Sequence, residues 1–304
     1  MITGLTLKNS IISGANNLSN RRAKVDELNV FPVPDGDTGT NMGMTIGAAR
    51  TELLNLPDDC TVEKAAQVTA SAMLRGARGN SGVILSLLFR GMAKKLRETD
   101  EADGRTLALA LREGVDTAYK AVMKPAEGTI LTVSRVAAQH AVELCQAEPT
   151  LTAEQVLAAI IEQGHTALEE TVHQNPVLEK AGVVDAGFGF ITIFEGMLDA
   201  LRGIHKERAV AAEPTKSTAD FAAINDEDIT FTYCTEFIAS RKDKARNVAR
   251  LRSILNEIGD SLVVVEDDDI VKVHVHTDQP NKALEEGLKF GPLLTVKIEN
   301  MREQ

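Results

Sequence analysis

The sequence has no tryptophan, only 2 tyrosines and 3 cysteines, and no long apolar run. The absence of tryptophan and the scarcity of tyrosine remove most of the stacking surfaces that bind single-stranded nucleic acids, and a net charge of −11 repels a phosphate backbone, so we expect no nucleic acid partner. A membrane-spanning helix needs about 18 consecutive apolar residues, so we expect no integral membrane segment. Three widely spaced cysteines argue against a disulfide framework, and the N-terminus lacks the apolar core of a signal peptide. These absences predict a cytoplasmic protein.

The chain of 304 residues is long enough for two domains, and its hydrophobic period changes near the middle. Residues 1–205 place apolar side chains at steps of three and four, which predicts an all-α helical bundle or barrel. Residues 206–228 are small, charged and aperiodic and predict a linker. Residues 229–304 alternate in places and predict a smaller α/β or α+β domain, with strands at 230–238, 261–265, 269–277 and 293–298 and helices at 242–258 and 281–288.

Two carboxylates, Asp35 and Asp37, lie one residue apart in the segment 29–41, between turn-forming prolines and glycines and a helix start. Hard anionic oxygens in a stiff loop suit Mg²⁺, which fills the rest of its octahedron with water and phosphate oxygens. An EF-hand would need Gly and Glu where Thr40 and Ile46 stand, which excludes that reading. A solvated Asp-Gly-Asp turn is the other interpretation of these residues.

Two further loops precede apolar helices and offer phosphate contacts. The first contains Gly79, Asn80, Ser81 and Gly82, whose free N–H groups at a helix start can receive phosphate. Because no Gly-Lys-Ser/Thr follows, it is not a Walker A loop, and an ordinary helix–helix turn stays open. The second ends on Thr129, which by itself predicts a helix N-cap.

A possible metal site of another kind lies in the second domain. His274 and His276 are two residues apart on a predicted strand and so point to one face, and Cys234 lies on another predicted strand. A thiolate and two imidazoles suit Zn²⁺, whereas a polar sheet face is the alternative. The acidic run 267–269 predicts a hairpin turn.

A resemblance to a known family rests on four segments in the same order: residues 29–42, 75–86, 124–131 and 181–187. They resemble the bacterial fatty acid kinases, whose N-terminal domain is related to the nucleotide-binding subunit of dihydroxyacetone kinases. The resemblance continues at 233–237 and 271–277. The fatty acid kinases have a further C-terminal domain, which we expect to be absent from this chain.

The resemblance implies ATP or ADP, Mg²⁺ and Zn²⁺ as cofactors and assigns residues to each. Asp35 and Asp37 would be catalytic and would hold Mg²⁺, with Asn29 donating an amide oxygen where related enzymes use a third carboxylate. Cys234, His274 and His276 match the zinc ligands. The nucleotide contacts would come from Thr38, Thr40, Asn41, Gly79, Asn80, Ser81, Gly82, Thr129, Asp185 and Gly187.

The implied activity is phosphorylation of the carboxylate of a fatty acid, presented by a separate fatty-acid-binding carrier protein, to give an acyl phosphate. No histidine precedes His140, so the motif loops have no imidazole base. A carboxylate acceptor needs none, because with a pKa of roughly 4.5 it is already ionised. We also expect a homodimer.

Three alternatives stay open. One is a dihydroxyacetone-type kinase for a small hydroxy-ketone, against which Thr38 counts because those enzymes often carry histidine there. Another is a zinc hydrolase that uses Cys234, His274 and His276. The last is a non-catalytic nucleotide-binding or dimerisation fragment.

Overall fold

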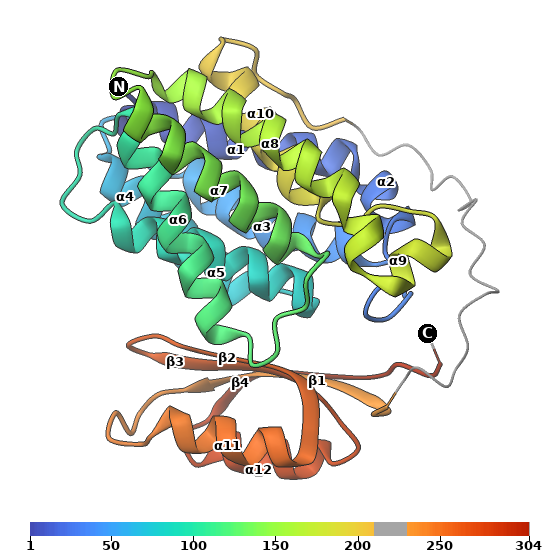
Figure 1. Cartoon of the computed structure of the whole chain (residues 1–304). Coiled ribbons are helices and arrows are strands. Elements are labelled where there is room, and N and C mark those ends of the chain that lie inside the picture. The colour runs from blue at the N-terminus through green and yellow to red at the C-terminus, as the bar shows by residue number, and fades with distance from the viewer. Residues whose placement is uncertain (210–229, 304) are drawn as a thin grey trace. The chain divides into compact units, whose positions relative to one another are not determined.

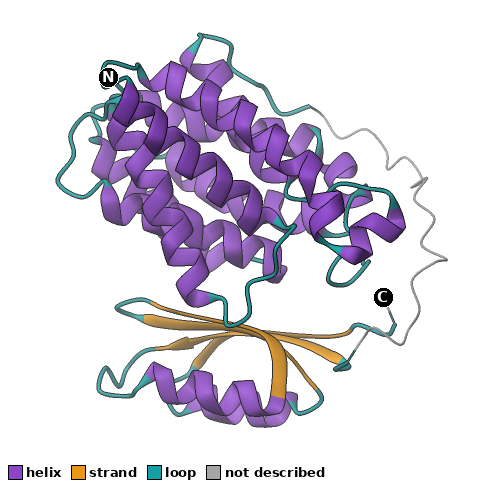
Figure 2. Cartoon of the chain, viewed as in Figure 1, coloured by secondary structure: helices purple, strands orange, loops and turns teal. Residues whose placement is uncertain are grey.

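The computed structural model describes residues 1–209 and 230–303, which form two compact units (Figure 1). The first unit holds Met1–Tyr119 and the chain from Ala126 to the end of the first described range, and it is built of helices. The second holds Lys120–Pro125 and the second described range, and it contains a sheet with two helices (Figure 2). The predicted fold class, a helical domain followed by a smaller α+β domain, is confirmed.

The helices of the first unit are α1 (Gly4–Asn20), α2 (Arg22–Glu27), α3 (Thr38–Leu54), α4 (Val62–Gly76), α5 (Gly79–Lys95), α6 (Gly104–Ala121), α7 (Ile130–Ala147), α8 (Ala153–Gln174), α9 (Pro176–Ala181) and α10 (Phe188–Leu201). Hydroxyl side chains begin several of them as N-caps. Thr61 accepts a hydrogen bond from the Lys64 N–H at the start of α4, and Thr152 forms a reciprocal capping box with Gln155 at α8.

These helices close into a ring. α1 packs along α10, α10 against α8, and α8 against α7. Arg112 of α6 donates to Gln139 of α7, and Lys94 of α5 pairs with Glu113 of α6 at 2.6 Å. α5 in turn packs on α3 and α4, and α3 packs on α1. The interior of the ring is apolar and includes Leu18, Met42, Leu85 and Phe194.

The contact between α1 and α10 depends on glycine. A Cβ atom at Gly196 would lie 2.8 Å from the Cα atom of Gly14 and 2.7 Å from the Ser13 carbonyl oxygen. Only residues without a side chain allow backbones to approach this closely. The close approach holds α10, and therefore the loop in front of it, in a fixed position.

The second unit contains the strands β1 (Tyr233–Ser240), β2 (Gly259–Glu266), β3 (Ile270–Thr277) and β4 (Leu293–Asn300), in the antiparallel order β2-β3-β1-β4. Two helices, α11 (Val248–Ile258) and α12 (Pro280–Leu288), cover one face of this sheet (Figure 1). Phe237, Val273 and Leu255 are among the side chains that form the core between the helices and the strands. Alternate residues of the central strands therefore point to the opposite face of the sheet.

The observed bounds follow the predicted ones with local differences. α11 begins at Val248 rather than near 242, because the Asn247 side chain accepts from the Ala249 N–H and so caps the helix there. α12 begins at Pro280, a residue suited to a first helical turn. The acidic run 267–269 forms the turn between β2 and β3, as predicted.

The predicted linker, 206–228, lies outside the described residues except for 206–209. Lys206 belongs to the described part, and its backbone hydrogen-bonds to Ser13 and Asn16 of α1. The domain boundaries at 205 and 229 stay predictions. Among the described residues, every helix is too short or too polar to cross a membrane.

Candidate functional site

The acidic loop joins α2 to α3 and is closed by Asn29. The buried Asn29 side chain donates from Nδ2 to the Val33 carbonyl at 2.6 Å and accepts at Oδ1 from the Thr38 N–H at 2.9 Å and from the Thr38 hydroxyl. Both ends of the loop are thus tied to one amide. In this structure both amide atoms of Asn29 make hydrogen bonds within the loop. The role of Asn29 as a magnesium ligand stays a prediction.

Asp26 supports the same loop from α2, and no sequence motif pointed to it. Its carboxylate accepts from the Thr40 N–H at 2.8 Å and from the Thr40 hydroxyl at 3.0 Å. Desolvation raises the pKa of Asp26, while the hydrogen bonds from Thr40 oppose that shift. Asp26 and Asn29 therefore satisfy the first turn of α3, where helix N–H groups need partners.

The side chains of Asp35 and Asp37 are not needed to satisfy the N–H groups in the first turn of α3. Asp37 occupies the N-cap position of α3, yet its side chain makes no capping hydrogen bond. Desolvation, and then the Asp37 carboxylate beside it, raise the pKa of Asp35 to about 7, although Asp35 remains exposed to solvent. Two like charges held together in an accessible loop favour binding of a divalent cation, which removes their repulsion.

The glycine loop in front of α5 lies against the first turns of α3. Gly79 has a φ of 57° and sits so close to Asn41 that a Cβ there would lie 2.4 Å from Asn41 Nδ2. Behind it, Thr45 Oγ1 accepts from the Arg78 N–H at 3.2 Å. The Asn80 Oδ1 atom is buried without a hydrogen-bond partner among the described residues. A buried oxygen without a hydrogen-bond partner, at a glycine loop that begins a helix, is suited to accept a hydrogen bond from a ligand.

Asp185 joins the starts of α7 and α10. Its carboxylate accepts from the Gly187 N–H at 2.7 Å and from the backbone of Ile130 and Ala186. Burial raises the pKa of Asp185 to about 7, against the effect of these hydrogen bonds. Thr129 caps α7, accepting from the Leu131 N–H, so both loops begin helices from adjacent points.

The start of α10 also meets the start of α3. A Cβ at Gly189 would lie 3.0 Å from the sulfur of Met42 and 3.3 Å from Val25 of α2. Together with the two contacts just described, this brings the N-termini of α3, α5, α7 and α10 to one place, beside the acidic loop (Figure 1). Helix N-termini carry positive partial charge and free N–H groups, which suits them to phosphate.

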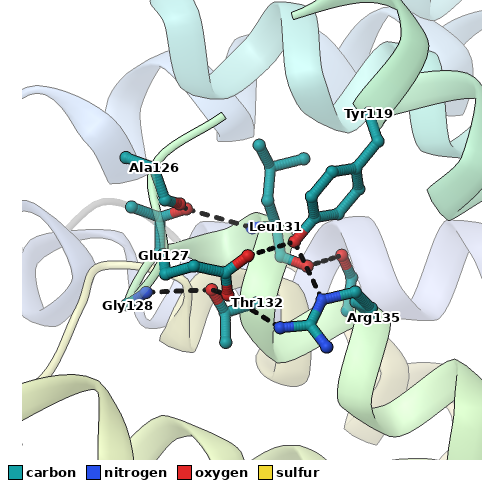
Figure 3. Close-up of polar contacts among 9 residues, drawn as sticks. Tyr119, Ala126, Glu127, Gly128, Leu131, Thr132 and Arg135 are labelled. Atoms are coloured by element: carbon teal, nitrogen blue, oxygen red, sulfur yellow. Dashed lines mark hydrogen bonds and ion pairs between the residues drawn. The ribbon is translucent and has the colours of Figure 1, made fainter. Parts of the chain in front are cut away.

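A polar network holds the loop before α7, and none of its side chains was predicted as a site residue (Figure 3). Arg135 donates to Glu127 at 2.7 Å and to the Tyr119 hydroxyl at 3.1 Å. Thr132 donates to the same Glu127 carboxylate at 2.7 Å and accepts from the Gly128 N–H at 2.9 Å. The loop that carries Thr129 is thus fixed from both α6 and α7.

The cysteine and the two histidines of the second unit come together on the sheet face away from α11 and α12. β1 and β3 pair with Cys234 opposite His276 and Glu236 opposite His274. The ligand atoms of Cys234, His274 and His276 lie within 4.8 Å of one another, and the two Nε2 atoms are 3.3 Å apart. This donor set fits Zn²⁺.

The pKa values of His274 and His276 are shifted in opposite directions. Burial lowers the pKa of His274, but Cys234 and Glu236 outweigh it and raise that pKa to about 10. Burial and the neighbouring His274 lower the pKa of His276 to about 3. Since a metal binds neutral imidazole, a bound cation would displace one of the two ring protons of protonated His274 and leave the other in place.

Comparisons with known proteins show the domain family to which the chain belongs. The family model described as the DAK2 domain matches residues 32–199, which is more than half of the chain. The chain therefore belongs to the DAK2 domain family.

A second family model matches the other unit. The middle domain of FakA-like fatty acid kinase proteins matches residues 230–304, and together the two matches support the predicted resemblance to a FakA-like fatty acid kinase subunit. The chain is 45% identical over 311 residues to an uncharacterized protein of Staphylococcus aureus strain bovine RF122 / ET3-1, and 44% identical to one of strain USA300. In both cases the match covers 100% of this chain and 56% of the relative.

Two solved structures are similar to the chain in fold at low identity. Dihydroxyacetone kinase from C. freundii in complex with AMP-PNP and Mg²⁺ matches with a TM-score of 0.49 and 18% identity, covering 64% of this chain and 33% of that one. The native form of that enzyme matches with a TM-score of 0.46 and 21% identity, covering 64% and 34%.

Proposed function

We propose that the chain is an ATP- and Mg²⁺-dependent phosphotransferase that phosphorylates the carboxylate of a fatty acid, presented by a separate fatty-acid-binding protein, to give an acyl phosphate. The observation that supports this most is the meeting of four helix N-termini beside the paired carboxylates Asp35 and Asp37. The match of the second unit to the fatty acid kinase middle domain supports the acceptor class. The proposal concerns a whole protein, whereas this chain spans 56% of the relatives it matches.

Each part of the site has a task in this proposal. Asp35 and Asp37 hold Mg²⁺, which when bound neutralises phosphate charge. Thr38, Thr40 and Asn41 in the first turn of α3 lie beside the triphosphate, while Asp26 and Asn29 keep that turn in place.

The remaining nucleotide contacts come from the two other loops. Gly79, Asn80, Ser81 and Gly82 present the N-terminus of α5, with the buried Asn80 oxygen available to a ligand. Thr129, Asp185 and Gly187 present the N-termini of α7 and α10. These groups position and stabilise charge, which is most of what phosphoryl transfer requires.

In the second unit we propose a Zn²⁺ site made by Cys234, His274 and His276. A sheet of four strands and two short helices is small for independent stability, and a structural metal would add to it. We also propose that the protein works as a homodimer in the cytoplasm.

The direct test is ATP consumption by this chain with a fatty-acid-binding protein loaded with fatty acid, beside a version extended to the length of the relatives. We expect ATP to be consumed and acyl phosphate to form when the loaded carrier is the acceptor. We expect no ATP consumption when dihydroxyacetone is the acceptor. Asp35→Ala should abolish acyl phosphate formation. Turnover of dihydroxyacetone would instead favour a small-molecule kinase, and nucleotide binding without turnover in both lengths would favour a non-catalytic role.

The same assay separates the zinc hydrolase alternative. If Cys234, His274 and His276 did the chemistry, Asp35→Ala would leave activity intact and Cys234→Ser would remove it. We expect instead that Asp35→Ala abolishes activity.

A further inference from the structure

Two acidic side chains lie behind the proposed zinc ligands, and no role was predicted for either of them from the sequence. Glu236 is opposite His274 in the pairing of β1 with β3, and its Oε1 lies 2.8 Å from His274 Nδ1. Asp260 is opposite His276 in the pairing of β2 with β3, and its Oδ1 lies 3.6 Å from His276 Nδ1. Each imidazole therefore has a carboxylate on its Nδ1 side.

The other ring nitrogens face each other. His274 Nε2 and His276 Nε2 are 3.3 Å apart, whereas the thiol of Cys234 lies 4.0 Å from His274 Nδ1, the atom that Glu236 also contacts. A histidine whose Nδ1 donates a hydrogen bond to a carboxylate has its Nε2 lone pair free for a metal. The arrangement orients both rings toward a common point.

Asp260 reaches this face only through an irregularity in β2. Leu262 and Val264 point into the core with α11 and α12, so strict alternation would turn residue 260 to that core as well. Instead the register shifts between Asp260 and Val263, and Ser261 has a φ of 49°. Val263 then lies opposite His274 and Asp260 opposite His276. The bulge thus turns a carboxylate toward the histidine pair.

We propose that Glu236 and Asp260 are positioning residues for the zinc site. Glu236 sets the orientation of His274 by accepting a hydrogen bond from its Nδ1 atom, and Asp260 acts on His276 through the longer electrostatic contact of 3.6 Å at its Nδ1 side. The inference rests on the zinc site proposed above. Glu236 has the larger effect, because its contact is the shorter of the two and it is buried, whereas Asp260 is partly exposed.

The experiment is a zinc titration of the whole chain in competition with a chromophoric chelator. Wild type should bind one Zn²⁺ per chain. Glu236→Ala should weaken binding by about 10- to 100-fold, the range found when outer-shell partners are removed. Glu236→Gln keeps an oxygen acceptor of the same size and should lose less. Asp260→Ala should lose several-fold.

The matched control is Glu299→Gln. Glu299 lies on the same sheet face, opposite Cys234 in β4, and pairs with Lys297 at 2.6 Å rather than with a histidine. Its variant should bind zinc as wild type does. A loss in Glu299→Gln equal to that in Glu236→Gln would show a general charge effect and overturn the inference.

The failures of the two proposals are distinguishable. If wild type binds no zinc, the zinc site itself is wrong. If wild type binds zinc and both Glu236→Ala and Asp260→Ala bind it equally well, the zinc site stands and the positioning role is wrong. Substitution with Co²⁺ adds a second readout, because its visible spectrum should change in Glu236→Gln if ring orientation changes and should match wild type if it does not.

Discussion

Single side chains divide the work at the acidic loop. Asn29 and Asp26 hold the backbone at the start of α3, so that Asp37 does not have to cap the helix that it precedes. Asp35 and Asp37 are left as neighbouring carboxylates, and desolvation, followed by the repulsion from Asp37, raises the pKa of Asp35. If Asp35 and Asp37 bind the cation as we propose, this separation from the supporting residues preorganises the loop for it.

Asn29→Asp separates the two roles open to Asn29. A metal ligand would bind Mg²⁺ more tightly as a carboxylate. A loop support would lose its Nδ2 donor and place an anion against the Val33 carbonyl, at a cost of about 1–3 kcal/mol in unfolding free energy. We expect lower stability in urea and weaker Mg²⁺ binding. The same change at the exposed Asn281 should affect neither, and tighter Mg²⁺ binding by Asn29→Asp would restore the ligand role.

The raised pKa of Asp185 predicts how the stability of the chain changes with pH. Its pKa in the folded chain is raised from 3.8 to about 7, so between these values the folded chain keeps a proton that the unfolded chain has lost. Asp185 therefore lowers stability progressively as pH rises from about 4 to about 7, and the loss is complete above that.

Asp185→Asn removes this titration and keeps an oxygen acceptor for the Gly187 N–H. The midpoint of thermal unfolding should therefore fall less between pH 5 and pH 8 in the variant than in wild type. Parallel curves for the two proteins would show that Asp185 is already ionised at pH 5.

At the scale of elements, the start of α7 is fixed by a network rather than by its cap alone. Thr129 caps the helix, but Glu127, Arg135 and Thr132 hold the loop in front of it (Figure 3). If that loop contacts the nucleotide, a change that touches only the network should act through nucleotide affinity.

Arg135→Met keeps the length of the side chain and removes its donors to Glu127 and Tyr119. We expect the KM for ATP to rise by about 5- to 10-fold, corresponding to about 1 kcal/mol, while kcat changes less. Arg105→Met, an exposed arginine at the other end of α6, is the control. An unchanged KM in Arg135→Met would remove the loop from the nucleotide site.

The elements themselves could be predicted better than the contacts between them. Apolar spacing identified the helical domain, alternation identified the strands at 230–238 and 269–277, and a short apolar run identified the strand at 261–265, because these patterns are local in sequence. The bulge at Ser261 could not be predicted, since a one-residue shift leaves no mark on an apolar run such as 262–265. Nor could Asp26 or Glu236 be identified, because each acts through a partner that the fold, and not the chain, brings near.

At the scale of the whole molecule, the chain is two compact units with separate cores and separate proposed ligands. A ligand that binds only the folded state stabilises the unit that holds it. Zinc should therefore stabilise the sheet unit and leave the helical unit unchanged.

Calorimetry with and without a zinc chelator tests this independence. Removal of zinc should lower one unfolding transition by on the order of 10 °C, as expected for a small domain that loses a ligand held at about 100 times its Kd. The second transition should stay in place and should move instead with Mg²⁺ and ADP. Equal shifts of both transitions would mean that the units unfold as one.

The central claim is that the acidic loop holds a divalent cation against the phosphates of a nucleotide, and calorimetric titration of ADP measures it most directly. Wild type should bind ADP with Mg²⁺ present and far more weakly in excess EDTA. Asp35→Asn with Asp37→Asn should bind Mg²⁺–ADP at least about 100-fold more weakly, since two ligand charges are lost, while Asp59→Asn, beyond the far end of α3, should match wild type. Equal affinity for Mg²⁺–ADP in wild type and the double variant would contradict the account.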